Sequence, residues 1–99
     1  MTIEWAAEAA AELDHMLAFI ASQNVGAAAG VVERVLQAER DILMFPAAGR
    51  FDSVTETYDR YIPKTRIILT YTMRDEIIWI ISVWHTSRDP VNKSPRKEA

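Results

Sequence analysis

The segment at residues 77–84 constrains the fold of this chain more than any other part of the sequence. It reads Ile-Ile-Trp-Ile-Ile-Ser-Val-Trp, with one polar residue among β-branched and aromatic side chains. Such a run is too short to cross a membrane and has the wrong side chains for a helix. It therefore predicts a central β-strand that is buried on both faces. The polar sequence His85-Thr86-Ser87-Arg88 follows at once, so the end of this strand is a candidate functional site, although ordinary strands also leave their cores in this way.

Length and composition bound the kind of protein. The 99 residues suffice for a single domain with a real core, predicted over residues 1–89, and residues 90–99 have the composition of a disordered basic tail. The 49% of apolar and 25% of charged residues are typical of a globular protein in water. The sequence shows no export signal and no apolar run long enough for a membrane span, so we expect a cytoplasmic protein without membrane contact.

The residues available for metal or cofactor chemistry are few. The chain has no cysteine, and its two histidines, His15 and His85, each lack a second histidine three or four residues away. No glycine-rich phosphate loop, nucleophile elbow or paired-carboxylate motif is present. We therefore expect no metal and no cofactor.

Two helices are predicted in the first half of the chain. Residues 6–23 are rich in alanine, and their larger apolar residues recur at the i, i+3, i+4 and i+7 spacing of a helix with one buried side. Asn24 is placed to cap a second helix over residues 26–44, which Phe45-Pro46 ends because the residue before a proline avoids the helical conformation. The short link between these helices predicts an antiparallel hairpin.

Strands are predicted around this hairpin. Thr2–Trp5 has the pattern of a short edge strand, and residues 54–62, 66–73 and 77–84 have β-branched and aromatic residues separated by short turns. The element order is therefore β-α-α-β-β-β. This order predicts an α+β domain in which a helical hairpin packs on one face of a small antiparallel sheet.

The last predicted strand has apolar residues on both of its faces. Strict alternation places Ile78, Ile80 and Trp84 on one face, and on the other face it places Ile77, Trp79, Ile81 and Val83. One helical hairpin covers one face of a sheet only. An apolar surface on the second face marks a partner-binding surface.

The charged residues leave two interpretations open. Arg50, Arg60, Arg66 and Arg88 could gather at one end or face of the sheet and bind phosphate or carboxylate groups. Alternatively, they pair on a solvated surface with Asp52, Glu56, Asp59 and Asp75. His85 is either a structural residue or, beside Arg88, a general acid or base for phosphodiester cleavage. The net charge of −3 argues against a protein that coats phosphate backbones.

Several segments, in this order and spacing, together resemble the RelE/ParE family of bacterial type II toxins. They are the strand Thr2-Ile3-Glu4-Trp5, a helix with Ala9, Leu13 and Ile20, the Asn24-x-x-Ala27-Ala28 link, Leu43-x-x-Pro46-x-x-Gly49-Arg50, Arg66-Ile67-Ile68-Leu69-Thr70-Tyr71, and Ile80-Ile81-Ser82-Val83-Trp84-His85-x-x-Arg88-Asp89. The resemblance covers residues 2 to about 89. It implies a toxin that is held inactive in a hetero-oligomer by a cognate antitoxin, whose C-terminal segment covers the apolar surface described above.

The resemblance implies one of two activities. RelE-like members cleave messenger RNA on the ribosome, whereas ParE-like members poison DNA gyrase. Thr86 stands where several of the nucleases have tyrosine, the chain is acidic with a pI near 5.3, and the Pro-x-x-Gly-Arg turn and the Val-x-His ending are similar to ParE. We therefore expect a non-enzymatic gyrase inhibitor. The alternatives are a metal-independent, ribosome-dependent endoribonuclease and an inactive relative that serves as a binding module.

The resemblance and the residue chemistry together give three sets of candidate site residues. Arg66 and His85 are catalytic if the nuclease alternative holds. The expected target-binding residues are Arg50, Arg60 and Arg88. The expected antitoxin-binding residues are Trp79, Ile81 and Trp84.

Overall fold

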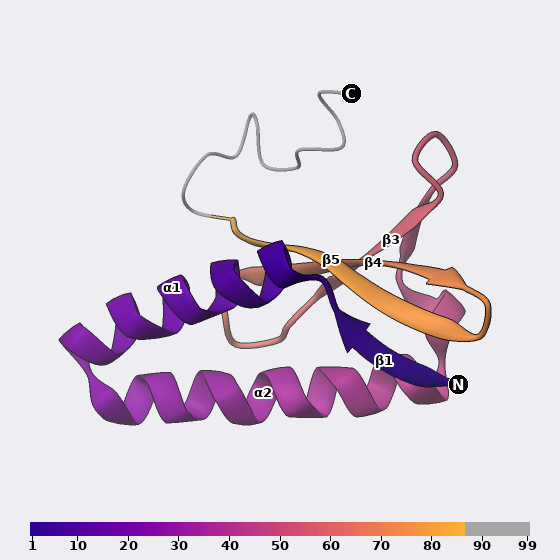
Figure 1. Ribbon diagram of the computed structural model, residues 1–99. Helices are drawn as coiled ribbons and strands as arrows, with labels where there is room; N and C mark the ends of the chain where they lie inside the picture. The colour runs from indigo at the N-terminus through magenta and orange to yellow at the C-terminus, as the bar shows by residue number, and fades with distance from the viewer. Residues whose placement is uncertain (87–99) are drawn as a thin grey trace.

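A hairpin of two helices and a five-stranded sheet make up the fold (Figure 1). The computed structural model describes residues 1–86, so Arg88, the end of the predicted domain at 87–89 and the predicted tail at 90–99 lie outside the described residues. The elements are β1 (Thr2–Trp5), α1 (Ala7–Gln23), α2 (Val25–Met44), the short 3-10 helix η1 (Pro46–Ala48), β2 (Arg50–Asp52), β3 (Thr57–Tyr61), β4 (Ile67–Arg74) and β5 (Ile77–His85). The predicted α+β class and the order β-α-α-β-β-β are confirmed, with β2 as one further short strand that was not predicted.

The sheet has the strand order β1-β5-β4-β3-β2. The strands β2 to β5 form an antiparallel meander, whereas β1 runs parallel to β5 and makes the sheet mixed. Asp75 and Glu76 join β4 to β5 with φ angles of 54° and 63°. Positive φ at both central residues is the geometry of a tight type I′ hairpin, whose twist matches that of the flanking strands. The sheet therefore places β5 between β1 and β4.

The helix boundaries follow from their end residues. The Asn24 side-chain oxygen accepts a hydrogen bond from the backbone N–H of Ala27 at 3.0 Å, and this confirms the predicted cap of α2. At the other end, Phe45 leaves the helical conformation directly before Pro46. Because a single residue links α1 to α2, the two helices run side by side in opposite directions (Figure 1).

The strand predicted over residues 54–62 is wrong in its first part. Instead, β2 and β3 are separated by a turn in which the Asp52 carboxylate accepts hydrogen bonds from the backbone N–H groups of Val54 and Thr55 at 2.9 and 3.4 Å. Such aspartate turns compete with extended backbone. Glu56 then takes a φ of 58°. The apolar Val54 and its threonine neighbours have the composition of a strand, but Asp52 decides the local backbone.

A β-bulge changes which side chains of β5 share a face. Thr70 pairs with Ser82, but the next residue, Tyr71, pairs with Ile80, so Ile81 is an extra residue in β5. One inserted residue reverses the alternation beyond it. Val83 consequently joins Ile80 in the core, and Trp84 lies opposite Ile68 on the other face. The predicted facing of Val83 and Trp84 is therefore wrong, because it assumed an unbroken pleat.

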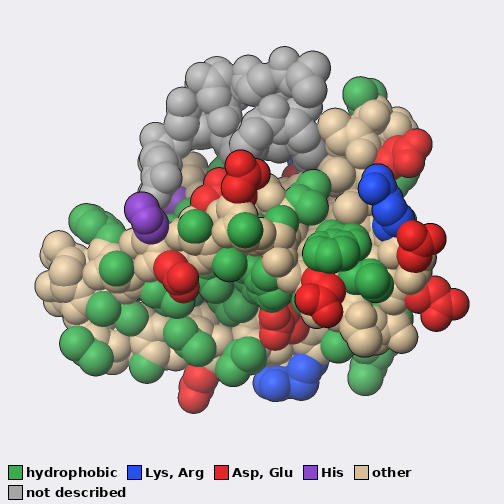
Figure 2. All heavy atoms as spheres, viewed as in Figure 1, with side chains coloured by type: hydrophobic (Ala, Val, Ile, Leu, Met, Phe, Trp, Pro, Cys, Tyr) green, Lys and Arg blue, Asp and Glu red, His purple; other side chains and the backbone are tan. Residues whose placement is uncertain are grey.

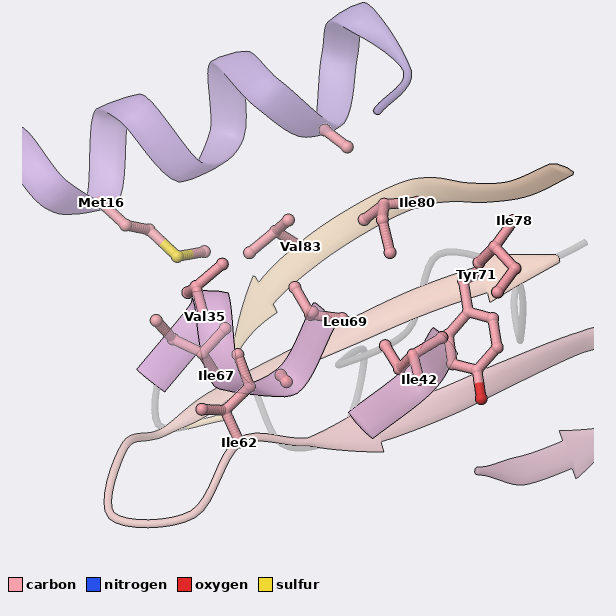
Figure 3. Packing of buried hydrophobic residues seen from close by; sticks show 12 residues of the cluster. Met16, Val35, Ile42, Ile62, Ile67, Leu69, Tyr71, Ile78, Ile80 and Val83 are labelled. Atoms are coloured by element: carbon pink, nitrogen blue, oxygen red, sulfur yellow. The ribbon is translucent and has the colours of Figure 1, made fainter. Parts of the chain in front are cut away.

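The core lies between the helical hairpin and one face of the sheet. Figure 3 shows Met16 of α1 and Val35 of α2 pointing toward Val83 of β5. The buried cluster consists of Ala9, Met16, Val35, Ala38, Ile42, Ile62, Ile67, Leu69, Tyr71, Ile78, Ile80 and Val83. Both helices contribute to this one cluster, which leaves the opposite face of the sheet to Trp79, Trp84 and their neighbours.

Candidate functional site

A groove lies between α1 and the second half of β5. The pairing of β1 with β5 ends at Trp5 and Ile80, and the chain then turns into α1, which runs beside the rest of β5. Glu12 bridges the two elements, since its carboxylate accepts a hydrogen bond from the backbone N–H of Val83 at 2.8 Å. The groove has a volume of about 310 Å³ and is lined by Ala11, Glu12, His15, Met16, Val83 and Trp84.

The second face of the sheet holds two of the predicted antitoxin-binding residues. Trp79 lies opposite Thr72 and Trp84 opposite Ile68, and these positions share the face that points away from the core. Ile81, the bulge residue, is exposed. Within residues 1–86, the buried Trp84 Nε1 and Ser82 Oγ have no hydrogen-bond partner. Buried donors without partners are rare in proteins. Both atoms are closed off from the surface, and the Trp84 side chain is itself buried.

The structure separates two of the predicted target-binding arginines. Arg50 is exposed on the edge strand β2 and lies opposite Asp59. Arg60, the residue after Asp59, therefore projects from the other face, where its guanidinium forms an ion pair of 3.3 Å with Asp41 of α2. The partner of Arg60 is thus a helix residue and not one of the four acidic residues expected from the sequence. The third predicted residue, Arg88, lies outside the described part of the chain.

The candidate catalytic residues Arg66 and His85 lie at the same end of the β4–β5 ladder. Ile67 is opposite His85, and the backbone N–H of Thr86 donates to the carbonyl oxygen of Arg66 at 2.7 Å. Arg66 is exposed, whereas His85 is half-buried. The two residues are one register step apart, so their side chains leave the ladder on opposite faces. This arrangement brings the two residues to the same end of the ladder but does not aim their side chains at one common point.

Within residues 1–86, no group of three or more His, Asp or Glu side chains is arranged to hold a metal ion. In the same residues, no helix has both the length and the apolar composition required to cross a membrane.

Three residues that shape these surfaces were not singled out from the sequence. The Glu12 carboxylate accepts a hydrogen bond from the Val83 N–H, and Asp41 forms an ion pair with Arg60. Arg34 and Arg60 both line a small pocket between α2 and β3. A signal for Glu12 existed, since Glu12, His15, Met16 and Phe19 share one side of α1 at the i, i+3, i+4 and i+7 spacing. The pairing of Asp41 with Arg60 depends on how α2 crosses β3, and local sequence carries no signal for it.

The fold of this chain is also found in a solved structure. The chain is similar to a chain of the solved structure titled "Chromosomal ParDE TA system from P. aeruginosa", with a TM-score of 0.74 and 17% sequence identity over 84% of this chain and 92% of the other. At this identity the similarity shows a shared fold. No curated protein has a significant match to the chain.

The family follows from the sequence itself. The model of the family described as "ParE toxin of type II toxin-antitoxin system, parDE" matches residues 3–90. This match spans nearly the whole chain, and the protein therefore belongs to the ParE toxin family of type II toxin-antitoxin systems.

Proposed function

We propose that this protein inhibits DNA gyrase and is neutralised by a cognate antitoxin that binds its apolar surfaces. The family match over residues 3–90 carries the proposal, because it places the whole described domain in the ParE branch expected from the sequence. The proposed mode of action is binding to the target and not catalysis, with Arg50, Arg60 and Arg88 as the target contacts.

The second face of the sheet supports the antitoxin part of the proposal. Trp79 and Trp84 lie on this face, and Ile81 is exposed at the bulge beside them. Aromatic residues that combine a large apolar area with a polar group are frequent at protein interfaces.

A second apolar surface runs along the helical hairpin. Val25, Val32, Leu36 and Leu43 are all exposed, and their spacing of seven, four and seven residues places them on one side of α2. Figure 2 shows hydrophobic side chains spread along the hairpin on the face in view. A lone protein in water gains nothing from an exposed apolar stripe of this length, so the stripe supports a partner that covers it.

The ribonuclease alternative has weaker geometric support. Arg66 and His85 lie at one end of the sheet, but their side chains leave opposite faces. General acid and base groups must reach the same phosphodiester within hydrogen-bonding distance. The acidic net charge of −3 also opposes docking into ribosomal RNA.

Induced expression in a bacterial host tests the proposal. Growth should stop, plasmid DNA should lose negative supercoiling, and messenger RNA should stay intact. Co-expression of the cognate antitoxin should restore growth. The nuclease alternative predicts intact supercoiling and cleaved messenger RNA instead. In that case Arg66→Ala or His85→Ala should abolish the RNA cleavage. Growth without any arrest would favour the inactive binding module.

A further inference from the structure

The region between α2 and β3 contains a small pocket with two arginines, which we call the Arg34–Arg60 pocket. It has a volume of about 120 Å³ and is lined by Arg34, Gln37, Ala38, Asp41, Arg60 and Pro63. Arg34, Ala38 and Asp41 are spaced four and three residues apart and therefore share one side of α2. Arg60 reaches this side from the helix-facing surface of β3.

The charges in this pocket do not balance. Asp41 is the one carboxylate among the six lining residues, and both of its oxygens are engaged, Oδ1 by the Gln37 side-chain amide at 3.0 Å and Oδ2 by Arg60 at 3.3 Å. Arg34 has no hydrogen bond or ion pair to any residue in the described range 1–86. The lining therefore holds two guanidinium groups and one carboxylate, an excess of one positive charge.

The geometry of Arg60 suits an anion. Its side chain is 25% exposed, and one of its five N–H donors is used in the 3.3 Å contact with Asp41. This partial burial strengthens charge-assisted hydrogen bonds to the guanidinium. A second oxyanion between Arg34 and Arg60 would complete the charge pairing.

We propose that the Arg34–Arg60 pocket binds the carboxylate of an acidic side chain from a protein partner. A nucleic acid backbone is less suited, because it requires a row of cations without acidic neighbours, whereas Asp41 lies among these arginines and Glu33 lines the adjoining pocket with Arg34 and Arg40. The neighbouring surface adds exposed Leu36, which favours a segment with both acidic and apolar residues. The assignment goes beyond the proposed gyrase inhibition and does not depend on it.

Nuclear magnetic resonance of the arginine Nε–H groups in the purified chain tests this assignment. The probe is the peptide acetyl-Leu-Asp-Glu-Leu-amide, added at constant ionic strength. We expect saturable shifts of the Arg34 and Arg60 signals, with the Arg74 signal unchanged. A peptide with Asn and Gln in place of Asp and Glu should give no saturable shift. Equal shifts from both peptides, or none from either, would overturn the proposal.

Substitutions sharpen the test. Arg34→Gln should weaken peptide binding about tenfold, since a charge-assisted hydrogen bond is lost. Arg34→Lys should retain part of the affinity. Arg74→Gln removes the same charge at the exposed end of β4 and should leave binding unchanged. Equal weakening of peptide binding by Arg34→Gln and Arg74→Gln would show that only the net charge of the protein matters, and this would overturn the assignment. Saturation of the pocket by a short DNA duplex, but not by the acidic peptide, would also contradict the assignment.

Discussion

The carboxylate of Glu12 accepts a hydrogen bond from the backbone N–H of Val83 at 2.8 Å, and this contact joins α1 to β5 beyond the last residue that β1 pairs. Beyond Ile80, β5 has no strand partner on the side of β1, so its backbone groups there would be unpaired at the sheet edge. The bulge at Ile81 turns the Val83 side chain into the core, and Glu12 accepts the hydrogen bond from the backbone N–H of Val83 itself. The helix side chain thus takes the place of a strand partner.

Glu12→Ala should lower the free energy of unfolding by about 1–2 kcal/mol, because it leaves the Val83 N–H without its acceptor in a partly buried groove. Glu12→Gln keeps an acceptor oxygen and should cost less. Urea denaturation of both variants measures the difference, and amide hydrogen exchange at Val83 should be faster in the alanine variant. Equal stabilities of the two variants would show that the hydrogen bond contributes nothing.

Gly49→Ala and Gly30→Ala should have opposite effects on stability. A Cβ at Gly49 would lie 2.9 Å from the backbone oxygen of Asp59 and 2.9 Å from Tyr71 Oη, so the sheet would have to shift. We expect a loss of about 1–3 kcal/mol. Gly30 lies within α2 with nothing within 4 Å of the new Cβ, so alanine should stabilise the protein by about 0.5–1 kcal/mol. Thermal denaturation checks both, and a neutral Gly49→Ala would contradict the close approach.

Tyr71 should make the protein less stable at alkaline pH. Burial raises the pKa of its phenol above the usual 10.0, an effect that the Gly49 backbone hydrogen bond and the Arg60 charge partly offset. The unfolded chain therefore loses this proton at a lower pH than the folded chain. The stabilisation from Tyr71 is complete below pH 10 and declines as pH rises from there toward the folded-state pKa.

Tyr71→Phe tests this effect. The variant should lose about 1–2 kcal/mol near neutral pH, since the Tyr71 hydroxyl donates to the Pro46 carbonyl at 2.6 Å. Its deficit relative to the unchanged protein should shrink above pH 10, as measured by urea denaturation across that range. Tyr58→Phe leaves the Pro46 contact in place and should keep the alkaline dependence. A deficit that is constant with pH would contradict the prediction.

Ile81→Asp should weaken antitoxin binding at least about tenfold, because it places a charge in the proposed interface without disturbing the core. Ile81 is exposed, so the melting temperature of the free toxin should change little. Val54→Asp, in the exposed turn between β2 and β3, is the matched control. Calorimetric titration with the antitoxin compares the two. Equal affinity of both variants would remove Ile81 from the interface.

The sequence predicted those parts of the fold that depend on local pattern. Apolar periodicity located α1, Asn24 and Pro46 marked the ends of α2, and the β-branched run located β5. The facing of Val83 and Trp84 could not be predicted, because the bulge at Ile81 depends on the pairing with β4. The strand β2 was missed because three residues are too few to show alternation, and Asp52 directs the following turn.

The candidate site was less predictable than the fold. The apolar residues of β5 indicated a partner surface, and the structure leaves Trp79, Ile81 and Trp84 outside the core cluster. The partner of Arg60 depends on the angle at which α2 crosses the sheet, which no short segment encodes. Charged side chains often form ion pairs with residues of other helices or strands, as Arg60 does with Asp41, so their pairing depends on the assembled fold.

The most direct test of the central claim is a supercoiling and DNA-cleavage assay with purified gyrase, relaxed and supercoiled plasmid, ATP and the purified protein. Gyrase inhibition predicts that supercoiling stops or that cleaved plasmid accumulates as the protein is added, and that an equimolar amount of antitoxin reverses the effect. Unchanged supercoiling and no cleaved plasmid, with a folded protein in excess over gyrase, would contradict it.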